Sequence, residues 1–363
     1  MRLWAGLALL WMALVLAACS PEAPAIPPAS EPTQTPSPTT SKPKPTAAPS
    51  RGKQPPRQVR FTAAGDFDTT SNTDDVLRRV KRLNSDLTLT VGDLSYDRPG
   101  NEQAWCDYVV SRVGADHPFQ LLAGNHESNG RNGHIDAFAS CLPNRLPGLV
   151  GTYGRRYYID VPAAQPLVRM IMISPGLTFP EGKAGYRSGS ADYKWTAQAI
   201  DSARAKSIPW LVVGMHHPCI TVGRYSCESG SDVFNLLVSK RVDLILSGHD
   251  HSYQRSKQLA LGGQCPAVKV DSVDSDCVVD SDARLDRGAG TVAVVVGTGG
   301  RRLYDVYDFD SEADYFAAFS GANRDPTYGV VQVRVTAKLL RASFIRASDG
   351  SREDSFVITA GSG

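Results

Sequence analysis

Short apolar segments that each end at a glycine recur along the chain between residues 59 and 300. Their β-branched composition and glycine boundaries predict buried strands. VRFTAAGD, LTLTVGD and FQLLAGNHE come first, WLVVGMHH and VDLILSGHDH follow, and TVAVVVGTGG comes last. All but the last carry a carboxylate, an amide or an imidazole beside the glycine. These polar residues are Asp66, Asp93, Asn125, His216, His217, His249 and His251.

Amphipathic helices are predicted between some of these strands. Residues 72–83 place four apolar side chains on one helical face, with basic residues on the other. Asn72 or Thr73 is the expected cap of this helix, and residues 193–206 and 231–240 have similar patterns. Strands that alternate with helices predict an α/β fold with parallel strands. Ligands of such sheets bind beyond the carboxyl ends of the strands, where glycine lets the chain approach closely.

The polar residues at the strand ends form a coherent set of metal ligands. A single aspartate after a strand is usually a turn or cap residue, but here acids, an amide and imidazoles recur at five strand ends. Carboxylate, amide oxygen and imidazole together suit Fe, Zn or Mn. The set exceeds what one tetrahedral ion needs, which indicates two ions that share a carboxylate. Two ions about 3.5–4 Å apart can stabilise an in-line displacement at phosphorus.

The N-terminal region differs from the rest in composition. Arg2 precedes an apolar run that ends in LAAC, which predicts a secretory signal peptide over residues 1–18. The alternative, a permanent membrane helix, is disfavoured because the run is shorter than the ~20 residues that a spanning helix needs. LAAC resembles the lipobox of bacterial lipoproteins, which implies lipidation of Cys19. The protein is then expected to be exported and anchored by lipid to the cell envelope, on the outer face of the cytoplasmic membrane or in the periplasm or outer membrane.

The remaining sequence divides into two parts. Residues 19–57 are rich in Pro, Ser and Thr with almost no large apolar side chain, so they predict a disordered tether. Residues 58–363 are expected to form the folded domain. The net charge of the chain is only +2, without a basic stripe, which argues against nucleic acid as a partner.

Cysteine usage fits an oxidising compartment. The chain has seven cysteines, and removing Cys19 leaves an even number in an exported protein, which predicts disulfides. Fifteen pairings of six cysteines are formally open, and we favour those between neighbours in sequence. The alternative of a cysteine metal site is disfavoured because no C-x-x-C spacing occurs. The expected pairs are Cys106 with Cys141, Cys219 with Cys227, and Cys265 with Cys277.

The order of the motifs resembles that of a known family. GD, GDLSY, GNHE, GMHHP and GHDHSYQR occur in this order between Asp66 and Arg255. They resemble the motifs of the calcineurin-like metallophosphoesterases, and most closely those of the purple acid phosphatases. Five motifs in order are specific, whereas any one alone is weak. The resemblance implies a four-layer αββα sandwich of two mixed sheets flanked by helices.

The resemblance also implies roles for the candidate ligands. The first metal, expected to be Fe(III), would take Asp66, Asp93, Tyr96 and His251. Asp93 would bridge to a divalent second ion, either Fe, Zn or Mn, that also takes Asn125, His216 and His249. A phenolate oxygen stabilises ferric iron and gives the family its purple colour, although Tyr96 could instead be a packed aromatic residue.

Three further residues are candidates for contact with the substrate. In the family, the histidine at the position of His126 contacts phosphate and can protonate the leaving group, a role that suits an imidazole near neutral pH. Glu127 is expected to orient His126. His217 could bind the phosphoryl group, or it could donate a hydrogen bond to a metal ligand.

One residue departs from the family pattern. The family usually has glycine two residues after the first aspartate, whereas this chain has Asp68 in GDFDTT. Asp68 could contribute an extra oxygen to the first metal or hold a coordinating water. It could equally be a turn carboxylate bonded to its own backbone.

The expected function is that of a dinuclear-metal phosphatase. It would hydrolyse small phosphate monoesters by direct attack of a metal-bound hydroxide, without a covalent phosphoenzyme, because no serine or cysteine has a base at a recognisable spacing. A phosphodiesterase or nucleotidase on the same scaffold is a second hypothesis. A surface lipoprotein that binds metal without catalysis is a third, and the presence of His126 argues against it.

Overall fold

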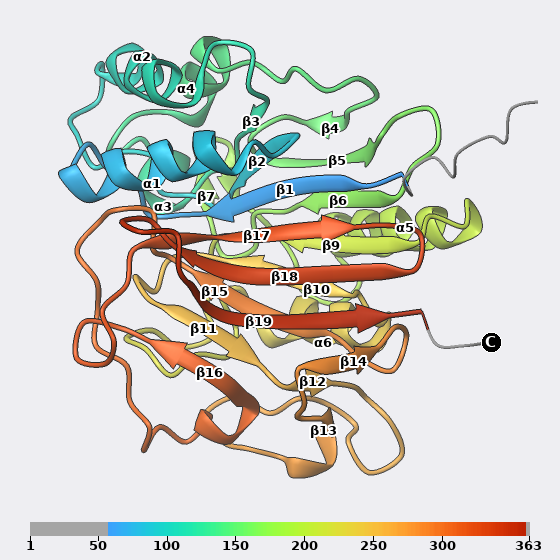
Figure 1. Ribbon diagram of the computed structural model, residues 1–363. Helices are drawn as coiled ribbons and strands as arrows, with labels where there is room; N and C mark the ends of the chain where they lie inside the picture. The colour runs from blue at the N-terminus through green and yellow to red at the C-terminus, as the bar shows by residue number, and fades with distance from the viewer. Residues whose placement is uncertain (1–56, 361–363) are drawn as a thin grey trace, which may run out of the picture. The chain divides into compact units, whose positions relative to one another are not determined.

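Two large mixed sheets form the centre of the computed structural model, which describes residues 57–360 (Figure 1). The first sheet has seven strands in the order β14-β19-β18-β17-β1-β2-β3. The second has eight, in the order β16-β11-β15-β10-β9-β6-β5-β4. This confirms the predicted fold class. The predicted signal peptide with Cys19, and the predicted tether up to residue 56, lie outside the described residues.

The strands have the following bounds. The first sheet contains β1 Val59–Ala64, β2 Leu87–Thr90, β3 Phe119–Gln120, β14 Arg284–Asp286, β17 Gly329–Val335, β18 Leu339–Arg346 and β19 Arg352–Thr359. The second contains β4 Val150–Thr152, β5 Arg156–Val161, β6 Val168–Met172, β9 Trp210–Gly214, β10 Leu244–Ser247, β11 Tyr253–Ser256, β15 Val292–Val296 and β16 Phe316–Ser320. Two small hairpins pair β7 Thr178–Phe179 with β8 Gly182–Lys183, and β12 Gln258–Leu259 with β13 Val278–Asp280.

The helices have the following bounds. They are α1 Ser71–Leu83, α2 Glu102–Val113, α3 Asn125–Ser128, α4 Ile135–Cys141, α5 Ala191–Ala205 and α6 Ser231–Ser239, with short 3-10 turns at Ser275–Cys277 and Ala313–Tyr315. Within residues 57–360, none of them is both long enough and apolar enough to cross a membrane.

The glycine-ended segments all form strands, but they divide between the two sheets. β1, β2 and β3 run parallel in the first sheet, and β9, β10 and β15 run parallel in the second. The strand pattern alone predicted parallel strands that end at one edge, and the family resemblance implied that they belong to two sheets. Because the strand ends of both sheets meet, polar residues from the two halves of the chain come together there.

Alternating side chains of the second sheet separate two apolar cores. Met170 and Met172 of β6 point into the core between the sheets. Ile171 and Ile173 point the other way, into the core with α5 and α6. Both faces of these strands are therefore covered, which explains why the segments are continuously apolar rather than alternating. Side-chain hydrogen bonds also join the two sheets. Asp354 of β19 accepts hydrogen bonds from Tyr253 and Arg255 of β11 at 2.7 and 2.6 Å.

The predicted helices are confirmed, with one correction at a boundary. In α1 the side chains of Val76, Leu77 and Val80 are buried as the pattern predicts. The helix begins earlier than expected, because the hydroxyl of Thr70, rather than Asn72 or Thr73, accepts the capping bond. Thr70 ends the loop that connects β1 to α1, so this cap also helps to hold that loop in place.

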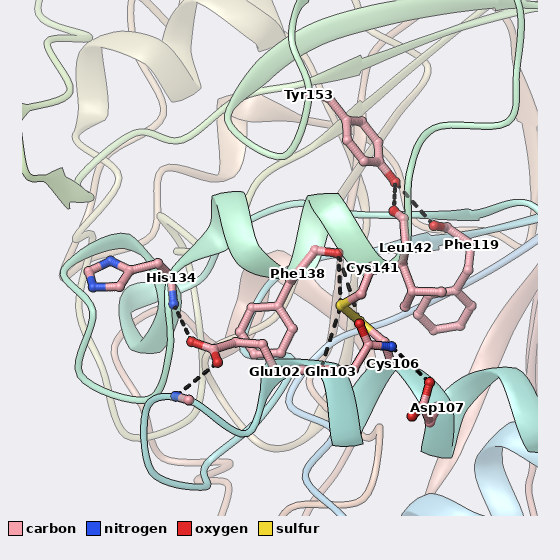
Figure 2. Close-up of a disulfide and its surroundings, with 11 residues drawn as sticks. Glu102, Gln103, Cys106, Asp107, Phe119, His134, Phe138, Cys141, Leu142 and Tyr153 are labelled. Atoms are coloured by element: carbon pink, nitrogen blue, oxygen red, sulfur yellow. Dashed lines mark hydrogen bonds between the residues drawn. A yellow bond between two sulfur atoms is a disulfide. The ribbon is translucent and has the colours of Figure 1, made fainter.

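The six cysteines within the described residues pair as predicted. Cys106 of α2 bonds to Cys141 at the end of α4 (Figure 2). The Cys219–Cys227 and Cys265–Cys277 disulfides close shorter loops. The Cys219–Cys227 loop follows His216 and His217 directly in sequence, so this crosslink restrains the segment beside the strand end of β9.

We expect the cost of losing a disulfide to follow the length of the loop that it closes. Cys106 and Cys141 are 35 residues apart, whereas Cys219 and Cys227 are eight apart. Chain entropy predicts that replacing both cysteines with serine lowers the free energy of unfolding by about 4 kcal/mol for the first pair and about 2.5 kcal/mol for the second. Urea unfolding of the two double variants measures this. Free thiols other than that of Cys19 in the unreduced wild-type protein would contradict the pairing itself.

Candidate metal centre

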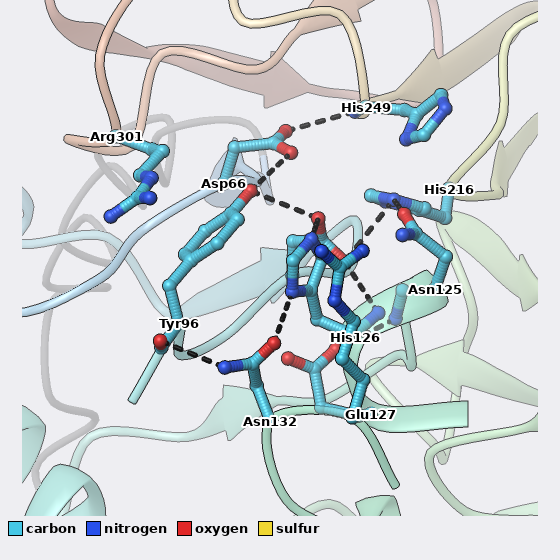
Figure 3. Close-up of polar contacts among 12 residues, drawn as sticks. Asp66, Tyr96, Asn125, His126, Glu127, Asn132, His216, His249 and Arg301 are labelled. Atoms are coloured by element: carbon cyan, nitrogen blue, oxygen red, sulfur yellow. Dashed lines mark hydrogen bonds and ion pairs between the residues drawn. The ribbon is translucent and has the colours of Figure 1, made fainter. Parts of the chain in front are cut away.

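The ends of strands from both sheets place the predicted ligands in one site (Figure 3). The first sheet supplies the carboxylates that follow β1 and β2, and the start of α3 supplies an amide. The second sheet supplies the imidazoles that follow β9 and β10. The side chains brought together are those of Asp66, Asp93, Tyr96, Asn125, His216, His217, His249 and His251.

Three of these residues converge on the phenol oxygen of Tyr96. This oxygen lies 2.9 Å from Oδ2 of Asp93, 3.2 Å from Oδ1 of Asp66 and 3.0 Å from Nε2 of His251. The alternative of Tyr96 as an ordinary packed aromatic residue does not account for a hydroxyl that faces two carboxylates and an imidazole. The arrangement is an oxygen-rich set with a single nitrogen, which suits a hard cation.

A second group is richer in nitrogen. Ring nitrogens of His216, His217 and His249 lie within 4.8 Å of one another. The amide oxygen of Asn125 lies 3.0 Å from Nε2 of His216. Asp93 connects the two groups, because its Oδ1 lies 3.3 Å from Nε2 of His216 while its Oδ2 faces Tyr96. One carboxylate therefore presents an oxygen to each group.

The burial of these groups fits the presence of cations. Asp66 and Asp93 are almost fully buried, and within residues 57–360 neither pairs with a lysine or an arginine. Both ring nitrogens of His217 are buried without a hydrogen-bond partner. Buried charges and unbonded polar atoms are costly unless a counter-ion compensates them. The types of donor atom fit bound metal ions, and so does the burial of two carboxylates without a lysine or arginine partner.

The ionisation of the site follows from burial and from these contacts. Burial lowers the pKa of His217, and the charges of His216, His249 and Lys183 add to the shift. Burial also opposes protonation of His251, but contact with Asp66 outweighs it and raises the pKa of His251. A neutral imidazole at His217 can donate a ring nitrogen to a metal.

The backbone at the site is strained in ways that aim the ligands. Asp66, Asp93 and His249 have positive φ angles of 61°, 51° and 69°, a region that residues other than glycine seldom occupy. Glycine is required beside them. A Cβ atom on Gly92 would lie 2.4 Å from the ring of His216, and one on Gly124 would lie 2.0 Å from Oδ1 of Asp93. The glycines of the motifs therefore permit the close approach of the ligands.

Asp68 has partners that the sequence did not predict. Its Oδ2 pairs with Arg301 at 2.5 Å, and its Oδ1 accepts the backbone N–H of Thr69. These contacts agree with the interpretation of Asp68 as a turn carboxylate bonded to its own backbone. They give no support to its interpretation as an extra metal ligand. The guanidinium of Arg301 also lies 4.3 Å from the centre of the Tyr96 ring. Asp68 thus holds a cation against the face of Tyr96.

The expected contact between Glu127 and His126 is wrong. Glu127 instead accepts backbone N–H groups of Leu94 and Gly124, at 2.8 and 2.9 Å, and so supports the loop that carries Asp93. Asn132 takes the role expected of Glu127, since its Oδ1 lies 2.5 Å from Nδ1 of His126. Burial, with the charge of Asp93, raises the pKa of Glu127.

The amide of Asn132 also determines which nitrogen of His126 carries hydrogen. Its Nδ2 donates to the carbonyl oxygens of Tyr96 and Asp97. Its Oδ1 must therefore accept from Nδ1 of His126. The other nitrogen, Nε2, lies 3.6 Å from Oδ2 of Asp93 and faces the site. Sequence reasoning missed Asn132, because an asparagine six residues after His126 in a glycine-rich loop carries no motif.

Glu228 was also missed. Its Oε2 lies 2.9 Å from Nε2 of His249 and 3.5 Å from Nε2 of His217. The contact with His249 lowers the pKa of Glu228. Its position directly after Cys227 is the only local signal, because the Cys219–Cys227 disulfide returns this segment toward the histidines.

Comparison with family models gives two matches. Residues 59–253 match the model of the calcineurin-like phosphoesterases. Residues 290–355 match that of the iron/zinc purple acid phosphatase-like protein C. The first match contains all the residues that form the two groups of the metal site.

Individual relatives and solved structures agree with these models. Purple acid phosphatase 21 of Arabidopsis thaliana is 27% identical over 218 residues, which are 57% of this chain and 47% of the relative. A nucleotide pyrophosphatase/phosphodiesterase of Hordeum vulgare is 24% identical over 292 residues, which are 76% of this chain and 72% of the relative. The structure of a purple acid phosphatase from yellow lupin seeds superposes with a TM-score of 0.61 at 17% identity, over 84% of this chain and 54% of that one.

The match to the relatives is partial in length. The chain spans about half the length of the first two Arabidopsis purple acid phosphatases that it matches. The family-model match over residues 59–253 nevertheless contains the residues of the metal site. On the evidence of its fold, its ligand geometry and these matches, the chain belongs to the calcineurin-like phosphoesterase family.

Proposed function

We propose that this protein is a dinuclear-metal phosphatase that hydrolyses small phosphate monoesters. The observation that carries the proposal is the position of Asp93, which presents one oxygen to the group around Tyr96 and the other to His216. A shared carboxylate of this kind holds two cations close together. Bound there, two ions would activate water and neutralise the phosphoryl oxygens.

The ligand sets differ in chemistry, which supports two different ions. Asp66, Asp93, Tyr96 and His251 offer mostly oxygen, with a phenol that favours Fe(III). Asn125, His216 and His249 complete a site for a divalent Fe, Zn or Mn ion. The family model that matches residues 290–355 is named for iron and zinc, in agreement with this proposal.

His126 is the proposed proton donor to the leaving group. Asn132 accepts a hydrogen bond from Nδ1 of His126. When the ring is protonated, the hydrogen on Nε2 therefore faces the site. General acid catalysis from such a group contributes about 10²–10⁴-fold. Glu228 contacts His217 and His249 of the nitrogen-rich group and also lines an open cavity.

Cleavage of diesters is the second candidate function. One observation favours it, namely the open cavity of about 580 Å³ beside Glu228, which leaves room for a second substituent on phosphorus. The barley relative named a nucleotide pyrophosphatase/phosphodiesterase covers more of this chain than the Arabidopsis relative does. Comparing kcat/KM for 4-nitrophenyl phosphate and bis(4-nitrophenyl) phosphate separates the two. We expect the monoester to be preferred, and a preference for the diester would replace the first proposal.

Replacing Tyr96 with phenylalanine tests the assignment of the oxygen-rich site. We expect the iron-loaded wild-type protein to absorb visible light through a phenolate–iron transition, and Tyr96→Phe to abolish this band. Elemental analysis and the visible spectrum measure the effect. Tyr304→Phe is the matched control, because Tyr304 stacks on His251 at 4.0 Å without reaching the carboxylates. A band that survives in Tyr96→Phe shows that Tyr96 is not a ligand.

Leaving groups of different basicity test the role of His126. Glycerol 2-phosphate has a basic alkoxide leaving group that needs a proton, whereas 4-nitrophenolate leaves readily without one. We expect His126→Gln to lower kcat for glycerol 2-phosphate by about 10²–10³-fold and kcat for 4-nitrophenyl phosphate by much less. Equal losses for the two esters would assign His126 to phosphate binding rather than to proton transfer.

A further inference from the structure

A cavity of about 580 Å³ opens beside the histidine side of the metal site. Its walls come from the segment around β8 and from the segment that leads into α6. Two of the lining residues connect it to the site. Glu228 contacts His249 at 2.9 Å, and a Cβ atom on Gly176 would lie 2.6 Å from Nδ1 of His217. A group bound in this cavity therefore lies next to the nitrogen-rich ligands.

Two acids and two cations line the cavity. The two acids are occupied, since Glu228 pairs with His249 and Asp232 accepts the backbone N–H of Ser188 at 2.8 Å. The two cations, Lys183 and Arg187, are exposed and have no ion-pair partner among residues 57–360. Lys183 and Arg187 are thus the charged lining residues whose side chains remain available to a ligand beside the metal site.

The start of α6 also lines the cavity, with Asp232 in its first turn. Gly230 precedes α6 and supplies no side-chain cap, so the first N–H groups of the helix add to the positive potential. A Cβ atom on Gly230 would meet nothing within 4 Å, which shows open space at this wall. His217, which is buried and unbonded, lies between this space and the metal ligands.

We propose that this cavity binds an anionic group on the leaving-group side of the substrate, so that the preferred substrates are phosphate esters that carry a second phosphate or carboxylate. The proposal rests on the proposed phosphatase function. Lys183 and Arg187 would contact the second anion through charge-assisted hydrogen bonds. They are specificity residues, because they lie outside the ligand set and would not contact the phosphorus that reacts.

Matched substrate pairs test the proposal in the metal-loaded, full-length protein. 3-Phosphoglycerate and glycerol 3-phosphate differ by one carboxylate, and fructose 1,6-bisphosphate and fructose 6-phosphate differ by one phosphate. We expect the wild-type protein to prefer the member with the additional anion, and the double variant Lys183→Ala/Arg187→Ala to lose about tenfold or more of that preference in kcat/KM. The pair with the larger loss identifies the anion. Lys81→Ala on α1 is the control, since Lys81 is exposed and does not line the cavity.

A binding measurement separates failure of this proposal from failure of the proposed function. Calorimetry with 3-phosphonopropionate and propylphosphonate compares the same two charge patterns without turnover. Propane-1,3-bisphosphonate adds the second phosphate-like group. The informative case is a protein that hydrolyses no ester. If the ligands with a second anionic group then bind more weakly to the double variant than to Lys81→Ala, the cavity assignment stands and the phosphatase proposal fails. Equal binding and equal kcat/KM ratios in the two variants would overturn the cavity assignment.

Discussion

The structure depends on the burial of two carboxylates, Asp66 and Asp93, where the ends of two sheets meet. Neither is paired with a lysine or an arginine within the described residues, and both face imidazoles and a phenol. Such a cluster is unfavourable unless positive charge is brought in. The glycines and the left-handed backbone at the strand ends are arranged so that this cluster can form. The rest of the site follows from that requirement.

The sequence predicted the parts that depend on local pattern. Each strand carries its own apolar run and its own glycine, and each ligand is adjacent to a strand, so the positions from Asp66 to His251 could be assigned without a structure. The disulfide pairs were predicted in the same way, from proximity along the chain. The family resemblance added the roles, which strand ends alone do not specify.

What the sequence could not predict depends on contacts between distant segments. Arg301 lies 233 residues from Asp68, so no spacing reveals their ion pair. Asn132 replaces Glu127 as the partner of His126 because the loop after α3 folds back, which is a property of its glycines and not of a motif. Thr70 caps α1 one residue before the helix starts, and several residues in GDFDTTSNT were chemically acceptable caps.

The site separates two tasks between two kinds of structure. Ligands follow the strands of the central sheets and are held by strained backbone and close glycine contacts. Most of the residues around the cavity lie at the end of β8 and just after it, and on the segment that follows the Cys219–Cys227 disulfide. Substitutions in these outer segments can change what is recognised without disturbing the groups that hold the ions, since loops accept change more readily than packed strands.

The division of the ligands between the sheets also has a consequence for biosynthesis. Asp66, Asp93 and Asn125 come from the first half of the chain, whereas His249 and His251 come later, and the carbonyl of Arg302 holds the ring of His251 at 2.8 Å. A growing polypeptide that stops short of these histidines lacks one donor of each group, because His251 belongs to the oxygen-rich group and His249 to the nitrogen-rich group. Neither group is complete until both histidines have been synthesised.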